Sequence, residues 1–391
     1  MRSISVASMA VCVSVIALGG CGGGSSKQIG PPGGDDQTDA GPTTGQLCSF
    51  LPSNFDLSAI DFDGVGDVVL PRDQTIETDL GGLLGGTGQY NYREVAQSSG
   101  PKLGIFAVKS LTIPAGVTAS AEGGDPLVIV ALGDIVVDGT LLGSSVTDPY
   151  WLGPGAQQQS GNENVAGAGS GGGAAGTPMS SAGGAGYCGA GGDGASLTGS
   201  ASKGGASWGT AALVPLVAGS DGATGGVGPG GNGGGAIQLT ACGALTVAGL
   251  IDVGGQGGTA SGVYDSTGAI SQQASGGGSG GAILLEGASV AVTGTLAANG
   301  GGGGGATHGS DATSDGQSAP GGTTSTDKAA GGGGGAGATA DGQPGQSQAA
   351  STAGAGGGAA GRIRINAKPS RATLTGMISP STGACTTQGT L

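Results

Sequence analysis

The chain has 391 residues, of which 96 are glycine, 10% are charged and 3% are aromatic. Its formal net charge is −14, with only 12 basic residues, so it lacks the basic surface that displaces counterions from phosphates, and nucleic acid is excluded as a partner. The glycine follows no strict G-X-Y period, which excludes collagen. The apolar residues, 36% of the chain, gather in short islands, which argues against disorder throughout.

Residues 1–20 have the features of an export signal. Arg2 precedes the apolar run 4–18, which predicts a signal peptide and is too short to span a membrane comfortably. The following Leu18-Gly19-Gly20-Cys21 resembles the bacterial lipobox, whose cysteine becomes the lipid-bearing first residue of the mature protein. The resemblance implies a palmitate-type anchor on Cys21 that holds the chain to a lipid bilayer. The alternative is ordinary secretion after cleavage near Gly20.

The residues after Cys21 bear on location. Gly22 stands where many inner-membrane lipoproteins have aspartate, so the lipobox resemblance implies the outer membrane or the cell surface. Residues 21–47 contain almost nothing apolar and predict a flexible, lipidated tether. We therefore expect the folded part, residues 48–391, to lie beyond the lipid headgroups.

Five apolar islands follow, at residues 104–124, 126–145, 234–255, 280–301 and 360–381. Their alternating pattern predicts β-strands. Four of them align on a reference glycine, at Gly139, Gly249, Gly294 and Gly376. The positions two residues before are apolar (Val137, Val247, Val292, Leu374), as are those two residues after (Leu141, Ile251, Leu296, Ile378). The first island fits with Ala115 as reference, flanked by Ile113 and Val117. The reference glycine is expected at a corner, where it can adopt a positive φ.

The spacing of the islands predicts a fold class. Ala115 and Gly139 are 24 residues apart, about one turn of a coil made of three short strands. We therefore expect an all-β fold, a right-handed parallel β-helix (solenoid), over residues 48–391. Long glycine-rich loop insertions are expected near residues 153–235, 254–281 and 300–361. Such loops are usually functional or disordered, or they could pack as parallel polyproline-II-like strands; the sequence leaves both open.

The pattern GGAIxLxA…LxVxGxIxxxGG, followed by glycine tracts and a late GRIRI, extends over about residues 103–380. It resembles that of glycine-rich, β-helix-type surface lipoproteins of myxobacteria and related bacteria. The resemblance implies a fold and a surface location, and it implies no activity.

Four cysteines remain after the signal and the anchor: Cys48, Cys188, Cys242 and Cys385. An even number in an oxidising compartment predicts two disulfides, for which three connectivities are possible. We favour Cys188–Cys242, which would fasten the longest glycine tract to the island after it, and hence Cys48–Cys385. The cysteines form no CxxC pair of the kind that zinc sites use.

Candidate binding residues are few. Asp61, Asp63 and Asp67 form an acidic, glycine-containing stretch that would suit calcium, although an acidic turn explains it equally. Trp151 and Trp208 stand in or beside the first glycine tract, and their large rings could bind a ligand or anchor a loop. The one histidine, His308, lies in a glycine-rich segment that predicts a solvated residue.

Enzymatic activity is the main alternative, because many parallel β-helices are polysaccharide lyases or hydrolases. Such enzymes place acidic or basic groups together on adjacent coils. The residues predicted to face outward include Gln238 and Glu286 but no pair of carboxylates, and Asp134 and Asp138 share one coil. Four basic residues near the end, Arg362, Arg364, Lys368 and Arg371, suit a solvated last layer or a small polyanion patch.

These observations predict an exported, lipid-anchored surface protein with a structural, adhesive or shielding role. No catalysis is expected, and no cofactor beyond a possible calcium ion. Polysaccharide or other envelope components are the candidate partners besides the bilayer. A lyase or hydrolase is the alternative function.

Overall fold

The computed structural model divides the chain into two compact units, Met1–Gly41 and Pro42–Leu391. It describes residues of the second unit only: 48–83, 88–144, 152–157, 164–197, 199–226, 228–262, 273–325, 329–348, 352–381 and 383–391. The predicted signal peptide, Cys21 and the tether 21–47 therefore lie outside the described residues. Within the described part, no helix is long and apolar enough to cross a membrane.

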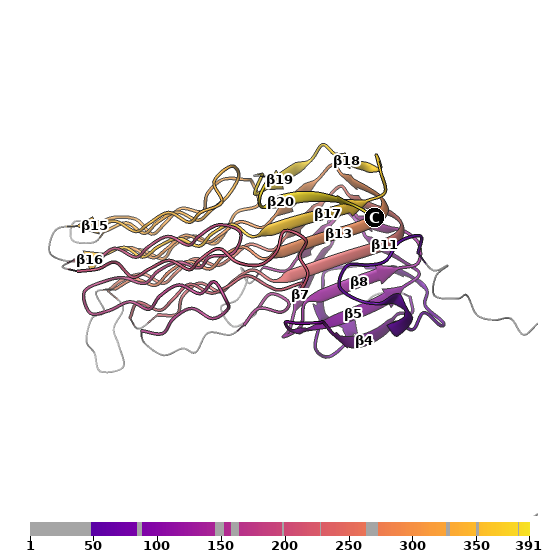
Figure 1. The fold of residues 1–391 in the computed structure, drawn as a ribbon, viewed down its shortest axis with the longest axis horizontal. Helices are drawn as coiled ribbons and strands as arrows, with labels where there is room; N and C mark the ends of the chain where they lie inside the picture. The colour runs from indigo at the N-terminus through magenta and orange to yellow at the C-terminus, as the bar shows by residue number, and fades with distance from the viewer. Residues whose placement is uncertain are drawn as a thin grey trace, which may run out of the picture. The chain divides into compact units, whose positions relative to one another are not determined.

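Most strands of the second unit belong to two sheets (Figure 1). The 11-stranded sheet contains β1 (Asp67–Val69), β4 (Asn91–Ala96), β5 (Lys102–Val108), β6 (Ser110–Ile113), β8 (Leu127–Ala131), β9 (Ile135–Val137), β11 (Ala236–Val247), β13 (Ala282–Val292), β17 (Arg362–Ala367), β18 (Ala372–Leu374) and β20 (Thr386–Thr390). The 7-stranded sheet contains β2 (Gln74–Glu77), β3 (Gly82–Leu83), β7 (Thr118–Glu122), β10 (Thr140–Leu142), β12 (Leu250–Asp252), β14 (Thr295–Ala297) and β19 (Met377–Ser379). A separate pair joins β15 (Ser347–Gln348) to β16 (Thr352–Ala353), and the only helical element of the described residues is a 3-10 turn, Leu57–Ala59.

The predicted fold class, an all-β right-handed parallel β-helix, was wrong. In the described residues, the strands form two mostly parallel sheets and helix is almost absent, an arrangement of strands like that of α/β proteins. Parallel neighbours need a long crossover connection, which is usually a helix. Here the glycine tracts provide the crossovers: residues 143–235 separate β10 from β11 in sequence, and β11 pairs directly with β8 and β9. The first two strands of the third and fourth islands also run on as one long strand each, β11 and β13, instead of two short ones.

The strands pair in the register that the aligned islands indicate. Val137, Val247, Val292 and Leu374 follow one another across β9, β11, β13 and β18. In the smaller sheet the same holds for Leu141, Ile251, Leu296 and Ile378. The first island departs from the alignment, because Leu141 pairs with Ala119 and not with Val117. Val117 belongs instead to a turn in which its N–H donates to the carbonyl of Pro114.

The reference glycines have a different role from the one predicted. None of the four has a positive φ. A Cβ on Gly249 would fall on the carbonyl oxygen of Gly139, one on Gly294 on that of Gly249, and one on Gly376 on that of Gly294. Glycine is therefore required here by the close approach of successive backbones.

Two apolar clusters hold the strands together. The first joins side chains from both sheets, among them Phe106, Leu127, Leu239, Val247 and Ile251. The second lies against the opposite side of the larger sheet, where residues 48–60, here named the N-terminal strap, contribute Phe50, Phe55, Leu57 and Ile60. The larger sheet is thus covered on both faces, as parallel sheets generally are.

The glycine tracts are built from segments that hydrogen-bond to one another. In segment 276–281, the N–H groups of residues 276 and 279 donate to segment 220–223, those of 277 and 280 to segment 356–359, and those of 278 and 281 to segment 253–256. Counting residues 274 and 275 just before it, the carbonyl groups of this stretch accept from segments 182–185, 231–234 and 301–304, again with residues three apart using one neighbour. Six segments therefore surround it. A three-residue period with all hydrogen bonds made to neighbours is that of a polyproline II helix.

We name this assembly, the described residues of 164–235, 253–281 and 298–361, the glycine bundle (Figure 1). Neighbouring segments run in both directions: 276–279 is antiparallel to 220–223 and parallel to 356–359. Interior segments have no room for a side chain at many of their glycines, although small side chains such as that of Ser279 fit between them. A Cβ on Gly276 would fall on the carbonyl oxygen of Gly183, and one on Gly277 on that of Gly301. The tracts are accordingly ordered crossovers in their described residues.

Candidate functional site

The four cysteines form Cys48–Cys242 and Cys188–Cys385. The pairing favoured from the sequence, Cys188–Cys242 with Cys48–Cys385, was wrong. Cys242 lies in an irregularity of β11, where the register with β13 shifts between Ala241 and Ala244, and there it contacts the second apolar cluster that includes Cys48. The bridge therefore fastens the start of the N-terminal strap to the larger sheet.

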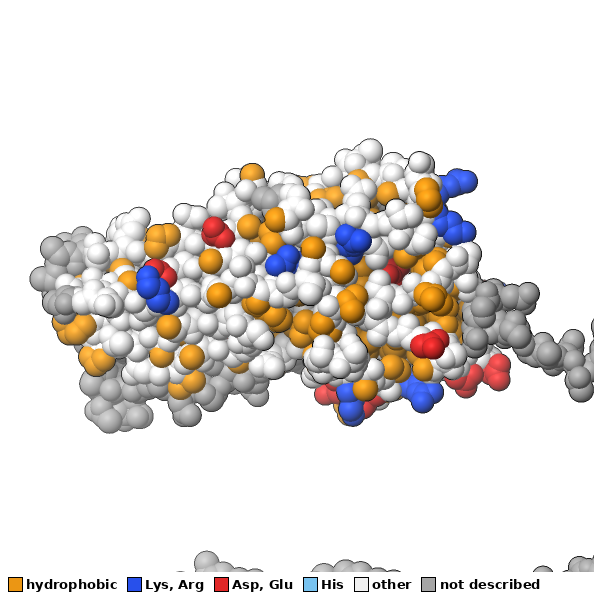
Figure 2. All heavy atoms as spheres, viewed as in Figure 1, with side chains coloured by type: hydrophobic (Ala, Val, Ile, Leu, Met, Phe, Trp, Pro, Cys, Tyr) orange, Lys and Arg blue, Asp and Glu red, His pale blue; other side chains and the backbone are white. Residues whose placement is uncertain are grey.

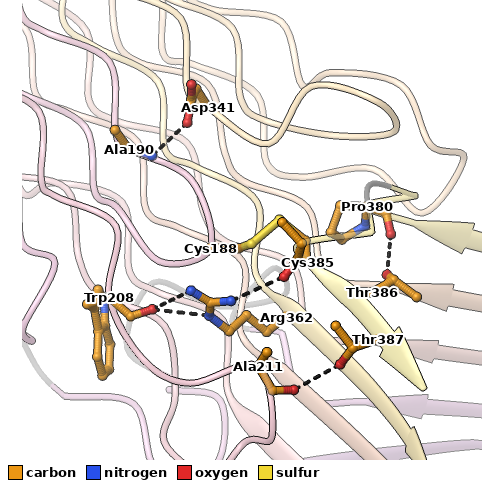
Figure 3. The surroundings of a disulfide bond; sticks show 11 residues. Cys188, Ala190, Trp208, Ala211, Asp341, Arg362, Pro380, Cys385, Thr386 and Thr387 are labelled. Atoms are coloured by element: carbon orange, nitrogen blue, oxygen red, sulfur yellow. Dashed lines mark hydrogen bonds between the residues drawn. A yellow bond between two sulfur atoms is a disulfide. The ribbon is translucent and has the colours of Figure 1, made fainter. Parts of the chain in front are cut away.

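The second disulfide fastens the glycine bundle to the end of the chain (Figure 3). Cys188 follows an interior segment of the bundle, and Cys385 immediately precedes β20. The two Cα atoms are 5.5 Å apart, although the residues are separated by 197 positions in sequence. The two bridges thus join the chain's most distant described segments to its centre.

The acidic stretch that could suit calcium does not form a cluster. The Asp61 carboxylate accepts the N–H of Asp63 at 2.9 Å, which closes a local turn. Asp67 instead accepts from Lys109 at 2.9 Å and from Ser110 at 2.7 Å. In the described residues, no group of three or more histidine, cysteine or acidic side chains is placed to hold a metal ion.

The other acidic and basic candidates have separate surroundings. Asp134 accepts the N–H of Ala244 at 2.7 Å, and Asp138 and His308 are exposed. Arg364 donates to Asn366 at 2.7 Å, while Lys368 is half-buried and Arg371 is exposed.

A buried polar network was missed by the sequence analysis. The strands β11 and β13 place Gln238, Thr240 and Glu286 on the face that we expected to meet solvent, and all three are 0% exposed under the N-terminal strap. The Glu286 carboxylate accepts from Gln238 at 2.8 Å, from Asn366 at 3.1 Å and from the Ser53 hydroxyl at 2.5 Å. A buried carboxylate without a cation partner needs several donors, and here the strap supplies one of them. The signal available in the sequence was the polar run itself, which a solvent-facing strand explains equally well.

Three aspartates in or beside the glycine bundle accept backbone N–H groups. Asp221 accepts from Gly233, Asp252 from Gly254 and Asp311 from Gly257, at 2.8 to 2.9 Å. Burial raises the pKa of Asp221 to about 7, against the lowering effect of the Gly233 N–H. Burial likewise raises the pKa of Asp252 to about 6. Of the three, Asp221 and Asp252 are buried and Asp311 is exposed.

Of the two tryptophans, Trp151 lies outside the described residues and Trp208 is held firmly in place. Its indole N–H donates to the carbonyl of Gly186 at 3.0 Å, and its backbone N–H donates to that of Tyr187 at 2.8 Å. The guanidinium of Arg362 donates to the Trp208 carbonyl at 2.8 and 3.1 Å (Figure 3). The Trp208 and Tyr187 rings lie 4.8 Å apart, and Tyr187 is fully buried. A Cβ on Gly171 would strike the indole.

Trp208 is nevertheless partly exposed, and it lines a hollow of about 320 Å³. The other lining residues are Gly100, Pro101, Gly124, residues 155–157, Gly169, Ser170 and residues 217–219. None of the lining residues, all of which the structure describes, is charged. The face shown in Figure 2 has few charged side chains over the glycine bundle. This hollow joins a fixed aromatic ring to polar side chains, and we take it as the candidate binding site.

The chain matches no protein-family model, no curated protein and no solved structure.

Proposed function

We propose that the chain is an exported surface protein, anchored in a bacterial outer membrane through lipid on Cys21, that presents the glycine bundle with an adhesive or structural role. The observation that carries the proposal is the bundle itself. Its segments are fixed by hydrogen bonds to several neighbours each, so it presents ordered side chains on a scaffold that contains little apolar surface of its own. A rigid scaffold lowers the entropy lost when a partner binds.

Two further features support this role. Two disulfides suit an oxidising compartment outside the cytoplasm, and the lipobox-like residues 18–21 suit an anchor. The lyase or hydrolase alternative depended on the β-helix class, which the two parallel sheets overturn. A purely structural role and an adhesive role differ in whether the bundle binds a ligand.

The anchor is tested by expressing the full chain in a Gram-negative bacterium with a clickable palmitate analogue. We expect label on the protein and its recovery in the outer-membrane fraction, with both lost in Cys21→Ala. Cys12→Ala is the matched control, because Cys12 lies within the signal-like segment and should leave labelling unchanged. Equal labelling of the wild-type and Cys21→Ala chains would refute the anchor.

Surface display is tested on the same cells by adding protease from outside. The exposed residues at the bundle periphery should be reached in intact cells if the protein faces outward. Protection in intact cells, followed by cleavage after outer-membrane permeabilisation, would place the protein on the periplasmic side and refute surface display.

A further inference from the structure

We propose that the hollow beside Trp208, here named the Trp208 pocket, binds one neutral pyranose unit of an extracellular polysaccharide. The inference deepens the adhesive role proposed above by naming its ligand class, and it rests on that role only for the ligand's biological source. Three properties of the pocket favour this ligand: its aromatic ring, its lack of charge and its size.

The ring is an aromatic platform fixed before any ligand binds. The indole N–H, the backbone N–H and the backbone carbonyl of Trp208 all have partners, at 3.0, 2.8 and 2.8 Å. Tyr187 packs against the indole from the bundle interior. Aromatic rings that are held in this way lose little conformational freedom on binding. The C–H groups of a pyranose ring form a flat apolar patch that suits such a surface.

The charge of the pocket selects among sugars. Every lining residue is uncharged, and the chain carries a net charge of −14. A uronic acid or a sulfated sugar would lose hydration without gaining a cationic partner, which is unfavourable. The hydroxyls of a neutral sugar need only hydrogen-bonding groups. Gln157 and Ser170, both exposed, contribute an amide and a hydroxyl to the lining of the pocket.

The size of the pocket limits the ligand. A volume of about 320 Å³ lies at the lower end of the range for small-molecule sites, and it admits a sugar unit but no folded protein domain. The pocket lies where residues 100–101 and 155–157 meet the glycine bundle, so an attached polysaccharide would contact both the strands and the bundle.

The experiment uses the purified full-length protein in detergent, with Trp151→Phe so that Trp208 is the one tryptophan that fluoresces. Soluble dextran, laminarin and yeast mannan are the neutral probes, and polygalacturonate and alginate are the acidic ones. We expect a saturable change in Trp208 fluorescence with at least one neutral probe, unchanged by added salt because no ion pair contributes. Fluorescence unchanged by all three neutral probes would overturn the proposal, as would tighter, salt-sensitive binding of an acidic probe.

Two pairs of variants show whether binding occurs in the pocket. Ser170→Arg should fill it and abolish the response, whereas Ser200→Arg, with the same change at an exposed serine outside the lining, should not. Gln157→Ala should weaken binding about three- to tenfold, as expected for the loss of one or two neutral hydrogen bonds, whereas Gln317→Ala should have no effect. Binding unaltered by Ser170→Arg and Gln157→Ala would assign the ligand to another site and overturn the proposal.

These outcomes are separable from those of the anchor experiment. Sugar binding in detergent does not depend on Cys21 or on the membrane that holds the protein. If the wild-type chain carried no palmitate label but still bound a neutral polysaccharide, the anchor would be refuted and the pocket would stand. Normal labelling and surface display with no binding would refute the pocket and keep the structural role.

Discussion

Gly278→Ala should strongly destabilise the glycine bundle. Gly278 lies in segment 276–281, which six neighbouring segments surround. A Cβ at this position would fall on the carbonyl group of Asn232 and close to the carbonyl oxygen of Gly231. These atoms belong to backbone that is itself hydrogen-bonded, so they cannot turn aside as a flexible side chain could.

The expected magnitude follows from the contacts. Overpacking a tight interior costs about 1–3 kcal/mol. Separating the backbones would also weaken the hydrogen bonds from Gly278 to Gln256 and from Gly301 to Gly278, at about 1 kcal/mol each. Alanine also lowers the conformational entropy of the unfolded chain, which offsets about 0.4–1 kcal/mol of this loss. The net loss in the free energy of unfolding should therefore be about 2–4 kcal/mol.

The matched control is Gly124→Ala, because a Cβ at Gly124 meets nothing within 4 Å. Urea unfolding followed by tryptophan fluorescence measures both variants, and amide hydrogen exchange over 276–281 shows whether the loss is local. We expect Gly124→Ala to be neutral or slightly stabilising. An equal, small effect of the two substitutions would refute the interior packing of the bundle.

Three further predictions follow from the described contacts. Burial raises the pKa of Asp221 to about 7 in the folded state, so the folded chain binds this proton more tightly than the unfolded chain does. The free energy of unfolding should therefore fall by up to about 4 kcal/mol as the pH rises from about 4 to above 7. Asp221→Asn should flatten this pH profile and stabilise the protein at about pH 8. Replacing Cys188 and Cys385 together by alanine should lower the free energy of unfolding by about 5 kcal/mol on the chain-entropy scale for a loop of this length, and an unchanged urea midpoint would contradict it. Incubation with neutral or acidic polysaccharides should release no new reducing or unsaturated ends; release that is lost in Asp134→Asn would establish an enzyme.

The strand registers could be predicted because each island carries an alternating apolar pattern that sets which face is buried. A slip of one residue would turn Val247 or Val292 outward, so the pattern fixes the pairing once the islands are aligned. Ala115 and Val117 misled the alignment because the turn that begins at Pro114 changes the spacing by two residues. An alternating pattern does not record such a turn.

The covering of the larger sheet could not be predicted. Residues 236–241 alternate polar and apolar side chains, and Glu286 is polar on the same face of the next strand, which is typical of a strand with one solvated face. The N-terminal strap covers that face through contacts that span 233 residues between Ser53 and Glu286. For the same reason the disulfide connectivity was wrong: Cys48 is close to Cys242 only because the strap crosses β11. Such contacts depend on the tertiary arrangement, for which one sequence has no local signal.

The sequence contains a partial signal that the glycine tracts are ordered rather than disordered. Consecutive glycines, as in Gly276–Gly278 and Gly300–Gly305, occur where the segments are buried. In a three-residue helix, consecutive positions point in three directions, so a segment enclosed on all sides needs glycine or another small residue, such as Ser279, at every one of them. A flexible linker has the same composition, and composition alone therefore leaves order and disorder open, as the sequence analysis did.

The physical basis of the bundle explains why the chain needs its disulfides. Glycine loses more conformational freedom on folding than any other residue, and segments without side chains gain little from burying apolar groups. Hydrogen bonds and close backbone contacts must then offset a large entropy cost, and each contributes only modestly. Cys188–Cys385 restricts the unfolded chain across 197 positions and so reduces that cost. Such a bridge persists only in an oxidising compartment. The folded unit therefore supports the proposal of export on grounds that do not depend on residues 1–20.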